Sequence, residues 1–343
     1  MVRAPDRLHA RGCRSLRAGK ISLAAILVAA ALSSLAGAQE APDQAAAALL
    51  DFIPEGADVV GCADVAAFRA HPRLLELRDN IRVVPGLWRS LDEFLRTTGL
   101  GLEKDVHRFA FGGSSARSPR GLLLVIRGGF RTPSLRRAME RGGWRAVRES
   151  GLDLLLSPAP TGAPARGATA RPVAACFPDR GTVLWGSKEW VVKAGRLHQG
   201  SGSSVKSGAE IRRLIGAMAG GEAAWCVAEG QQAAQQALRG LFPQEAVGVT
   251  EVLGKVERLT LSIDPAREIR IHGLAEAAGE GEAGALADAL RAAIALAKLQ
   301  VQADPLALAA LRSVRIAQDG REVAVEAALP QGLIREPASR GSS

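Results

Sequence analysis

The sequence contains no tyrosine, and aromatic residues make up only 4% of its 343 residues. Proteins that bind single-stranded nucleic acid usually stack the bases on aromatic side chains. Grooves that bind sugars tend to need such rings as well. The composition therefore argues against both classes, and we expect no nucleic acid among the partners.

Established catalytic motifs are also missing, since the chain has no GxSxG, no P-loop and no HExxH. Residues 279–284 fit GxGxxG and precede an apolar-periodic helix from Leu286 to Val301, but Glu280 and Glu282 suit a helix N-terminus better than a pyrophosphate site. Residues 203–206 fit SxxK, but they lie in a Gly/Ser-rich stretch without KTG or SDN elsewhere. We therefore predict no catalytic residue and no cofactor.

Cysteine is scarce. Beyond residue 38 the chain carries only Cys62, Cys176 and Cys226, each in an apolar, strand-like segment. An odd number on buried strands favours buried thiols over a disulfide framework. If any pair forms a disulfide, it should be Cys62 with Cys226, because a sequence repeat gives them equivalent positions.

Histidine is equally sparse, and no pair has the spacing of metal ligands. The four histidines beyond residue 38 are His71, His107, His198 and His272. His107 and His272 lie on strands whose neighbours look like packing positions, so we interpret them as structural residues. We therefore predict no metal site.

Two carboxylates occupy matching places in the two halves of the sequence. Asp64 and Glu229 each follow a strand that bears a cysteine, and each precedes a helix. We favour ordinary helix N-terminal charges. The alternative is a pair of acids that face each other across a cleft, as a hydrolase would need.

The first 38 residues are typical of a secretory signal peptide. Six basic residues precede an uncharged apolar run from Ile21 to Leu35, and the small residues Ala36, Gly37 and Ala38 follow. We predict cleavage after Ala38. The run is shorter than the ~20 residues that span a bilayer, so retention as an anchor is the less favoured alternative.

Export would place the mature protein in the periplasm or outside the cell. Residues 1–38 hold six of the 44 Lys+Arg and one of the 35 Asp+Glu, which leaves 38 minus 34, or +4. A charge this small does not by itself argue for an anionic partner. No partner follows from the sequence, although another envelope protein is a candidate, and a membrane is one only if the signal is retained.

The two halves repeat one order of predicted elements: strand, helix, strand, strand, helix, strand. Val106–Phe111 matches Val256–Leu261 in register, and Ile126–Gly128 matches Ile271–Gly273 on the next strand. We therefore predict an α+β fold of two tandem related split-βαβ (ferredoxin-like) units with mainly antiparallel sheets. A hairpin around Asp319-Gly320 closes the second unit.

Composition sets the expected domain boundaries. Residues 199–208 are rich in Gly and Ser, which is typical of an exposed, non-helical linker. The predicted parts are a signal peptide (1–38), a spacer with a short helix (39–56), a first α+β domain with an accessory hairpin and helix (57–198), the linker (199–208), a second α+β domain (209–330) and a disordered tail (331–343).

The layout resembles a loose class of uncharacterised bacterial secreted proteins. The residues that carry the resemblance are Ile53–Val60, with its Ile-Pro turn before a strand, the Gly-Leu-x-x-Asp-Val segment from Gly101 to Val106, and the Gly-Ser-x-x-x-Val helix start from Gly186 to Val191. The resemblance covers most of residues 50–330. It implies an extracytoplasmic α+β protein and transfers no catalytic residue.

From these observations we expect an exported, non-enzymatic binding or cell-envelope protein. Two alternatives remain open at this point. One is an extracytoplasmic hydrolase with an unrecognised site, and the other is a membrane-tethered structural protein.

Overall fold

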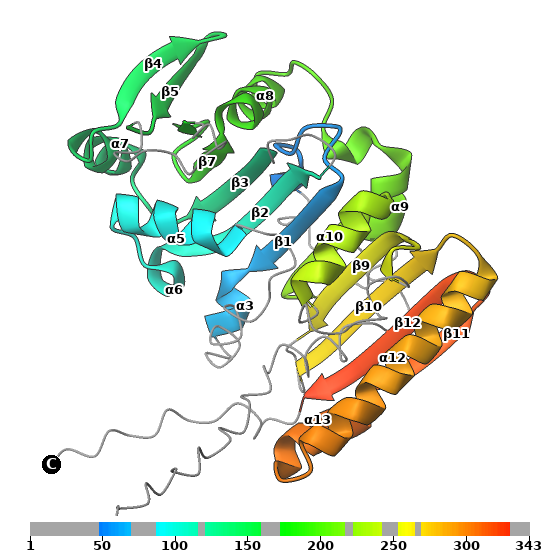
Figure 1. Ribbon diagram of the computed structural model, residues 1–343. Helices are drawn as coiled ribbons and strands as arrows, with labels where there is room; N and C mark the ends of the chain where they lie inside the picture. Colours follow the sequence, from blue (N-terminus) through cyan, green and yellow to red (C-terminus); the bar gives the residue numbers. More distant parts are fainter. Residues whose placement is uncertain are drawn as a thin grey trace, which may run out of the picture.

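A single antiparallel sheet runs through the protein (Figure 1). The computed structural model describes residues 48–69, 87–115, 121–158, 172–216, 222–241, 253–264 and 269–329. Within them, twelve strands are joined in the order β11-β12-β10-β9-β8-β1-β2-β3-β7-β6-β5-β4. The strands are β1 (Val59–Asp64), β2 (Val106–Ser114), β3 (Gly121–Gly128), β4 (Arg145–Glu149), β5 (Leu152–Leu156), β6 (Val173–Cys176), β7 (Thr182–Ser187), β8 (Ala224–Glu229), β9 (Val256–Asp264), β10 (Ile269–Ala277), β11 (Arg315–Asp319) and β12 (Glu322–Leu329).

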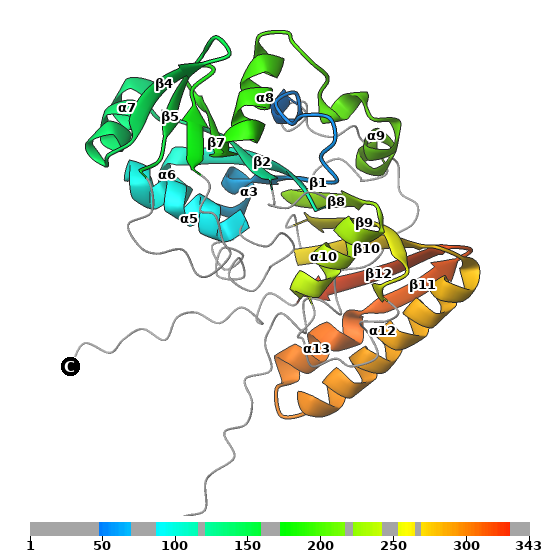
Figure 2. The same ribbon diagram turned by 45° about the horizontal axis from the view of Figure 1, so that its top comes forward.

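Helices pack on both faces of the sheet. The helices are α3 (Val65–Arg69), α5 (Leu87–Thr98), α6 (Leu102–Asp105), α7 (Thr132–Arg141), α8 (Lys188–His198), the 3₁₀ turn η2 (Val205–Ser207), α9 (Ala209–Gly216), α10 (Gln231–Leu241), α12 (Glu280–Gln300) and α13 (Pro305–Ser313). Figures 1 and 2 show α12 and α13 lying over β10, β12 and β11.

Two hydrophobic cores lie on opposite faces of the sheet. The first core extends under α5, α7, α10, α12 and α13, with Leu91, Leu135 and Leu290 among its buried residues. The second core lies under α8 and α9 and includes Trp190 and Ile211. The first core reaches both halves of the chain, whereas the second is concentrated on β1–β3, β5–β8 and the helices over them.

β1 and β8 form the centre of the sheet. They pair antiparallel, with Val59 opposite Ala228 and Ala63 opposite Ala224. The sequence of β1 does not alternate, which predicts burial on both faces. That prediction is confirmed, because Val59 contributes to the first core and Val60 to the second.

The predicted ferredoxin-like units are wrong in their topology. A split-βαβ unit needs parallel neighbouring strands, but every strand pair among the described residues is antiparallel. The chain leaves β1, passes through helices and returns as the immediate neighbour β2. The strands thus build one wide sheet instead of two small ones.

The two halves extend outwards from the centre in related orders. One side reads β8-β9-β10-β12-β11, and the other reads β1-β2-β3-β7-β6-β5-β4. Helices follow the first and third strands in both halves. The β6–β7 hairpin, predicted as an accessory piece, lies between β3 and the β5–β4 hairpin, and the described strands of the other half include no counterpart.

The Gly/Ser-rich stretch 199–208 is exposed and non-helical over residues 199–203, as predicted, but Val205–Ser207 form the 3₁₀ turn η2. The Val205 side chain is 2% exposed and belongs to the second core. Its N–H donates to the Ile53 carbonyl (2.8 Å), and the Glu55 N–H donates to the Ser203 carbonyl (2.9 Å). The stretch is therefore held against the chain that precedes β1.

The sheet ends in two short strands, β4 and β11, of five residues each. Both have mainly exposed side chains, among them Arg145 and Arg148 on β4 and Arg315 and Asp319 on β11. Among the described residues, no helix is long and apolar enough to cross a membrane. The predicted signal peptide and tail lie outside the described residues.

Candidate functional site

A polar surface covers one face of β9, β10, β12 and β11. Alternate residues of β10 point to opposite faces: Ile271 and Ala275 enter the first core, while His272 and Glu276 point the other way. We call the side chains on this second side the polar sheet face. They are Arg258, Thr260, Ser262, Asp264, Arg270, His272, Leu274, Glu276, Arg315, Ala317, Asp319, Glu322, Ala324, Glu326 and Ala328.

Strand register arranges this face in rows that cross the sheet. Residues directly opposite each other share a face and lie side by side. One row is Glu229–Arg258–Glu276–Glu322–Asp319, the next is Val227–Thr260–Leu274–Ala324–Ala317, and the third is Trp225–Ser262–His272–Glu326–Arg315. A row of small and apolar residues therefore runs between two charged rows.

None of the described helices packs on this face of β10, β12 and β11. The helices that pack on these strands are α12 and α13, and their buried residues belong to the first core on the opposite side; α9 reaches β10 only through the side chain of Arg213. α9 packs on β8 and borders the face. The face holds five carboxylates and three guanidinium groups, so it is more acidic than the predicted mature chain as a whole.

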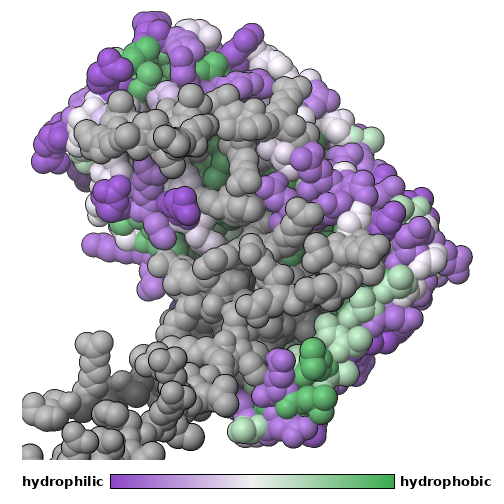
Figure 3. All heavy atoms as spheres, in the orientation of Figure 1, coloured by the Kyte–Doolittle hydropathy of each residue, from purple (hydrophilic) through white to green (hydrophobic). Residues whose placement is uncertain are grey.

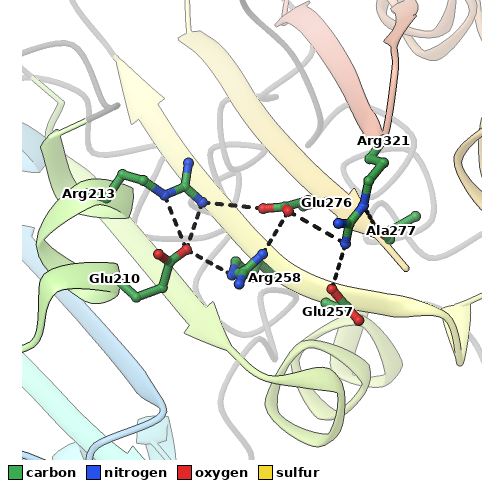
Figure 4. Close-up of polar contacts among 7 residues, drawn as sticks. All are labelled: Glu210, Arg213, Glu257, Arg258, Glu276, Ala277 and Arg321. Atoms are coloured by element: carbon green, nitrogen blue, oxygen red, sulfur yellow. Dashed lines mark hydrogen bonds and ion pairs between the residues drawn. The ribbon is translucent and has the colours of Figure 1, made fainter. Parts of the chain in front are cut away.

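An ion-pair cluster joins α9 to the strands at one end of the polar sheet face (Figure 4). Glu210 accepts from Arg213 at 2.7 Å and from Arg258 at 2.8 Å. Arg258 also contacts Glu276 at 2.6 Å, and Arg213 reaches Glu276 at 3.2 Å. The cluster therefore connects α9, β9 and β10 through charge-assisted hydrogen bonds.

Arg321, in the turn between β11 and β12, extends the cluster. Its Nη2 lies 2.7 Å from Glu257 and 3.7 Å from Glu276, and its Nε donates to the Ala277 carbonyl at 2.9 Å. The cluster thus has three arginines and three glutamates, and it is neutral. Charges that neutralise one another in this way hold elements together, and we assign the cluster a structural role.

The pKa values of two nearby carboxyl groups, Glu210 and Glu229, are shifted in opposite directions. The hydrogen bond from Arg213 lowers the pKa of Glu210. Burial raises the pKa of Glu229, and the neighbouring carboxylate of Glu210 raises it further. Both shifts arise at the border of the polar sheet face, where α9 approaches β8 and β9.

Asp64 and Glu229 do not converge. Because β1 and β8 are antiparallel, Asp64 lies beside Ala223 at one end of the pair and Glu229 beside Asp58 at the other. The separation is six residues along a strand, or about 20 Å. The two acids therefore line no common cleft.

Each of the two acids lies opposite an arginine on the next strand. Asp64 is paired with Arg108 at 2.7 Å, and its Oδ1 accepts from the Ala66 and Ala67 N–H groups at the start of α3. It is thus the helix N-terminal charge that we favoured. Glu229 lies opposite Arg258 in register.

The contacts of the SxxK and GxGxxG matches are those of ordinary structural residues. Lys206 of the SxxK match pairs with Asp51 at 2.8 Å, and Ser203 is exposed. In the GxGxxG match, Gly279 caps α12 and Glu280 and Glu282 lie in its first turn. Neither segment brings together the groups that its motif would need.

Cys62, Cys176 and Cys226 are buried in the sheet and form no disulfide with one another. Cys62 and Cys226 enter opposite cores, so their side chains point to opposite faces. The repeat that suggested their pairing is offset by one residue here, because Gly61, and not Cys62, is the partner of Cys226. Burial raises the pKa of Cys226 to about 12 and that of Cys176 to about 11.

The histidines are dispersed. His198 stacks on Phe52 with ring centroids 5.5 Å apart, His107 is exposed, and His272 lies within the polar sheet face. His71 lies outside the described residues. In the part of the chain that the structure describes, no group of three or more His, Cys, Asp and Glu side chains could hold a metal ion.

No local sequence pattern indicates the polar sheet face as a site. Its residues come from four strands that are up to 70 positions apart, and each strand alternates like any half-buried strand. Only the strand order shows that these alternating residues share one surface. α9, which borders the face, had no predicted counterpart.

No protein-family model and no curated protein sequence matches this chain. Among solved structures, crystal form I of TP0453 is similar with 9% sequence identity and a TM-score of 0.43, over 82% of this chain and 91% of that chain. Crystal form III of TP0453 gives 9% identity and a TM-score of 0.44, over 81% and 92% of the two chains. Likenesses this distant assign no function to the chain.

Proposed function

We propose that the protein is an exported, non-enzymatic binding protein of the cell envelope, and that the polar sheet face is its binding surface. The observation that supports this proposal is the unequal covering of the sheet in its second half. α10, α12 and α13 pack on one face, while the polar sheet face has no described helix over β10, β12 and β11. Thr260, Ser262 and Ala324 within this face are buried, so a partner would bind on its exposed part over β11, where Arg315, Ala317 and Asp319 lie.

The surroundings of the predicted acids support a non-enzymatic role. Asp64 is engaged by Arg108 and by the first N–H groups of α3. Glu229 is about 20 Å away at the other end of the central strand pair. The hydrolase alternative, which needed these two acids together, therefore receives no support from them.

A membrane-tethered structural protein is the remaining alternative. It differs from the proposal only in the fate of residues 1–38, which lie outside the described residues. Retention of the apolar run from Ile21 to Leu35 would anchor the chain and would leave the polar sheet face available.

We further propose that the two halves arose by internal duplication. The Asp64–Arg108 pair and the opposed Glu229 and Arg258 support it, because each places an acid at the end of the first strand and an arginine opposite it on the second. On this proposal the β6–β7 hairpin is an insertion into the first copy.

Site-specific photo-cross-linking in the native host tests the binding surface. A photoreactive residue at Ala317, exposed on β11, should give one discrete cross-linked envelope protein. The matched control is Ser134, an exposed small residue on α7, which should give none. Cross-links of equal pattern at both positions, or at Ser134 alone, would contradict the proposal.

Cell fractionation with intact mass measurement tests export. The expected product lies outside the cytoplasm and begins at Gln39. A product in the membrane fraction that retains residues 1–38 supports the tethered alternative. A full-length product in the cytoplasm would overturn export itself.

A further inference from the structure

The outer side of α12 is apolar although it faces solvent. Leu296 and Leu299 are 58% and 65% exposed, and they are the only large hydrophobic side chains exposed among the described residues. In Figure 3 hydrophobic colours follow α12 along the lower right border of the molecule. Exposed leucines that adjoin one another on a helix mark a contact surface more often than scattered ones do.

The outer apolar residues follow a strict helical spacing. They recur at intervals of four and three residues, which places them on one side of the helix. We call them the α12 stripe: Ala285, Ala289, Ala292, Leu296, Leu299 and Ala303, the last of which follows the final turn.

The opposite side of α12 is apolar as well. Leu286, Leu290 and Ile294 are buried in the first core against β10 and β12. A helix that is apolar on both sides is normally covered on both sides. The α12 stripe therefore needs an occupant that the described part of this chain does not supply.

The stripe is complementary to itself. Consider two copies of α12 that run antiparallel and cross at the level of Ile294. Ala289 of one copy then faces position 299 of the other, Ala292 faces position 296, and Ala285 faces position 303. Each leucine then meets an alanine, so large and small side chains alternate across the contact. A two-fold axis requires this reciprocity, since residue i contacts j and j contacts i.

We propose that the occupant is a second copy of this chain, and that two α12 helices pack antiparallel around a two-fold axis at Ile294. The charges beside the stripe are compatible with this arrangement. Asp288, which is 79% exposed and pairs with Arg291 of its own chain at 2.8 Å, faces position 300 of the other copy in the antiparallel pair. That point is two residues, or about 3 Å along the axis, from Lys298 of the partner subunit.

The expected dimer is weak. The helical part of the stripe, from Ala285 to Leu299, is about 21 Å long, and a single helix pair lies at the low end of specific interface sizes. We therefore expect an equilibrium that shifts to monomer on dilution. The proposal is independent of the proposed function, because α12 and the polar sheet face lie on opposite faces of the sheet.

Sedimentation of the protein purified from its host tests the dimer. The protein should change from monomer to dimer as its concentration rises. Leu296→Glu should abolish the dimer over the same range, because it places two like charges next to the axis. The matched control is Ala146→Glu, which adds the same charge at an exposed site on β4. The control should sediment like the parent protein, and near-UV circular dichroism should show that both variants fold.

Cysteine cross-linking tests the orientation. The two copies of position 295 lie about 3 Å apart along the axis and on the same side of the helix pair, so a short bismaleimide linker should join Ala295→Cys into a covalent dimer. Position 285 faces position 303 of the other copy. The two copies of position 285 are therefore about 27 Å apart along the axis, and Ala285→Cys should remain monomeric on the gel. Cys62, Cys176 and Cys226 are buried, and the parent protein should not cross-link.

Three results would overturn the proposal. The first is a parent protein that stays monomeric at every concentration, and the second is cross-linking of Ala285→Cys in place of Ala295→Cys. The third is a monomer that co-sediments with phosphatidylglycerol vesicles and loses this binding through Leu296→Glu. That result would make a lipid surface the occupant of the stripe.

Discussion

The carboxyl group of Glu229 is held where its charge is unfavourable, because burial and Glu210 both raise its pKa. Relative to the unfolded chain, it favours folding only when it is protonated. That contribution is fully present below about pH 4 and is lost as the pH rises through the raised pKa.

We therefore expect Glu229→Gln to raise the Tm slightly at pH 7, and to leave it unchanged below about pH 4. Thermal unfolding followed by circular dichroism across this range measures the difference. The matched control is Glu210→Gln. The pKa of Glu210 is lowered by Arg213, so this variant should lower the Tm at pH 7 and lose its effect as the pH falls. Shifts of the same sign in both variants would contradict the assignment.

Single residues were predictable where their contacts are local. Asp64 was predicted as a charge at a helix N-terminus, and its bonds to Ala66 and Ala67 confirm this. Its pairing with Arg108 was not predictable, because the two residues are 44 positions apart and meet only through strand register. The cysteine pairing was wrong for a similar reason, since an offset of one residue turns a strand side chain to the other face.

At the scale of the element, β1 depends on a glycine. A Cβ added at Gly61 would lie 2.2 Å from the Phe111 ring and 2.6 Å from the Trp225 carbonyl oxygen. The ring therefore occupies the place of a side chain on the strand. Only glycine lets β1, β2 and β8 approach as they do at this point.

Gly61→Ala should consequently destabilise the protein by about 1–3 kcal/mol, the usual cost of overpacking. Gly281→Ala is the control, because its Cβ would meet nothing within 4 Å in the first turn of α12. That variant should be neutral or more stable by up to about 1 kcal/mol. Denaturant unfolding measures both values, and a neutral Gly61→Ala would show that Phe111 moves away freely.

Element boundaries were far easier to predict than element neighbours. The hairpin predicted around Asp319-Gly320 is found as β11–β12, with Asp319 at the end of the first strand and Glu322 at the start of the second. Periodicity and turn residues carry this local information. The insertion of β7 and β6 beside β3 leaves no periodic signal, and so the strand order could not be predicted.

For the whole molecule, the pairing of β1 with β8 makes one sheet of both halves. The first core also includes residues from either side of residue 208, such as Leu124 and Leu286. Neither half can then lose its structure without exposing an edge and a part of the core of the other.

We therefore expect a single cooperative unfolding transition. In the variant Trp225→Phe all remaining tryptophans lie in the first half, so their fluorescence reports on that half. This signal should coincide with far-UV circular dichroism, which reports on both halves. Two separate transitions would favour the domains predicted at 57–198 and 209–330.

The two outer strands carry a consequence for the behaviour of the protein in concentrated solution. An open sheet with unpaired edges can add strands from other molecules and grow into fibrils. Here β4 and β11 are only five residues long, and each places charged side chains along its exposed edge. Strand addition is thereby discouraged at both ends, and a very wide sheet is compatible with a protein that does not polymerise.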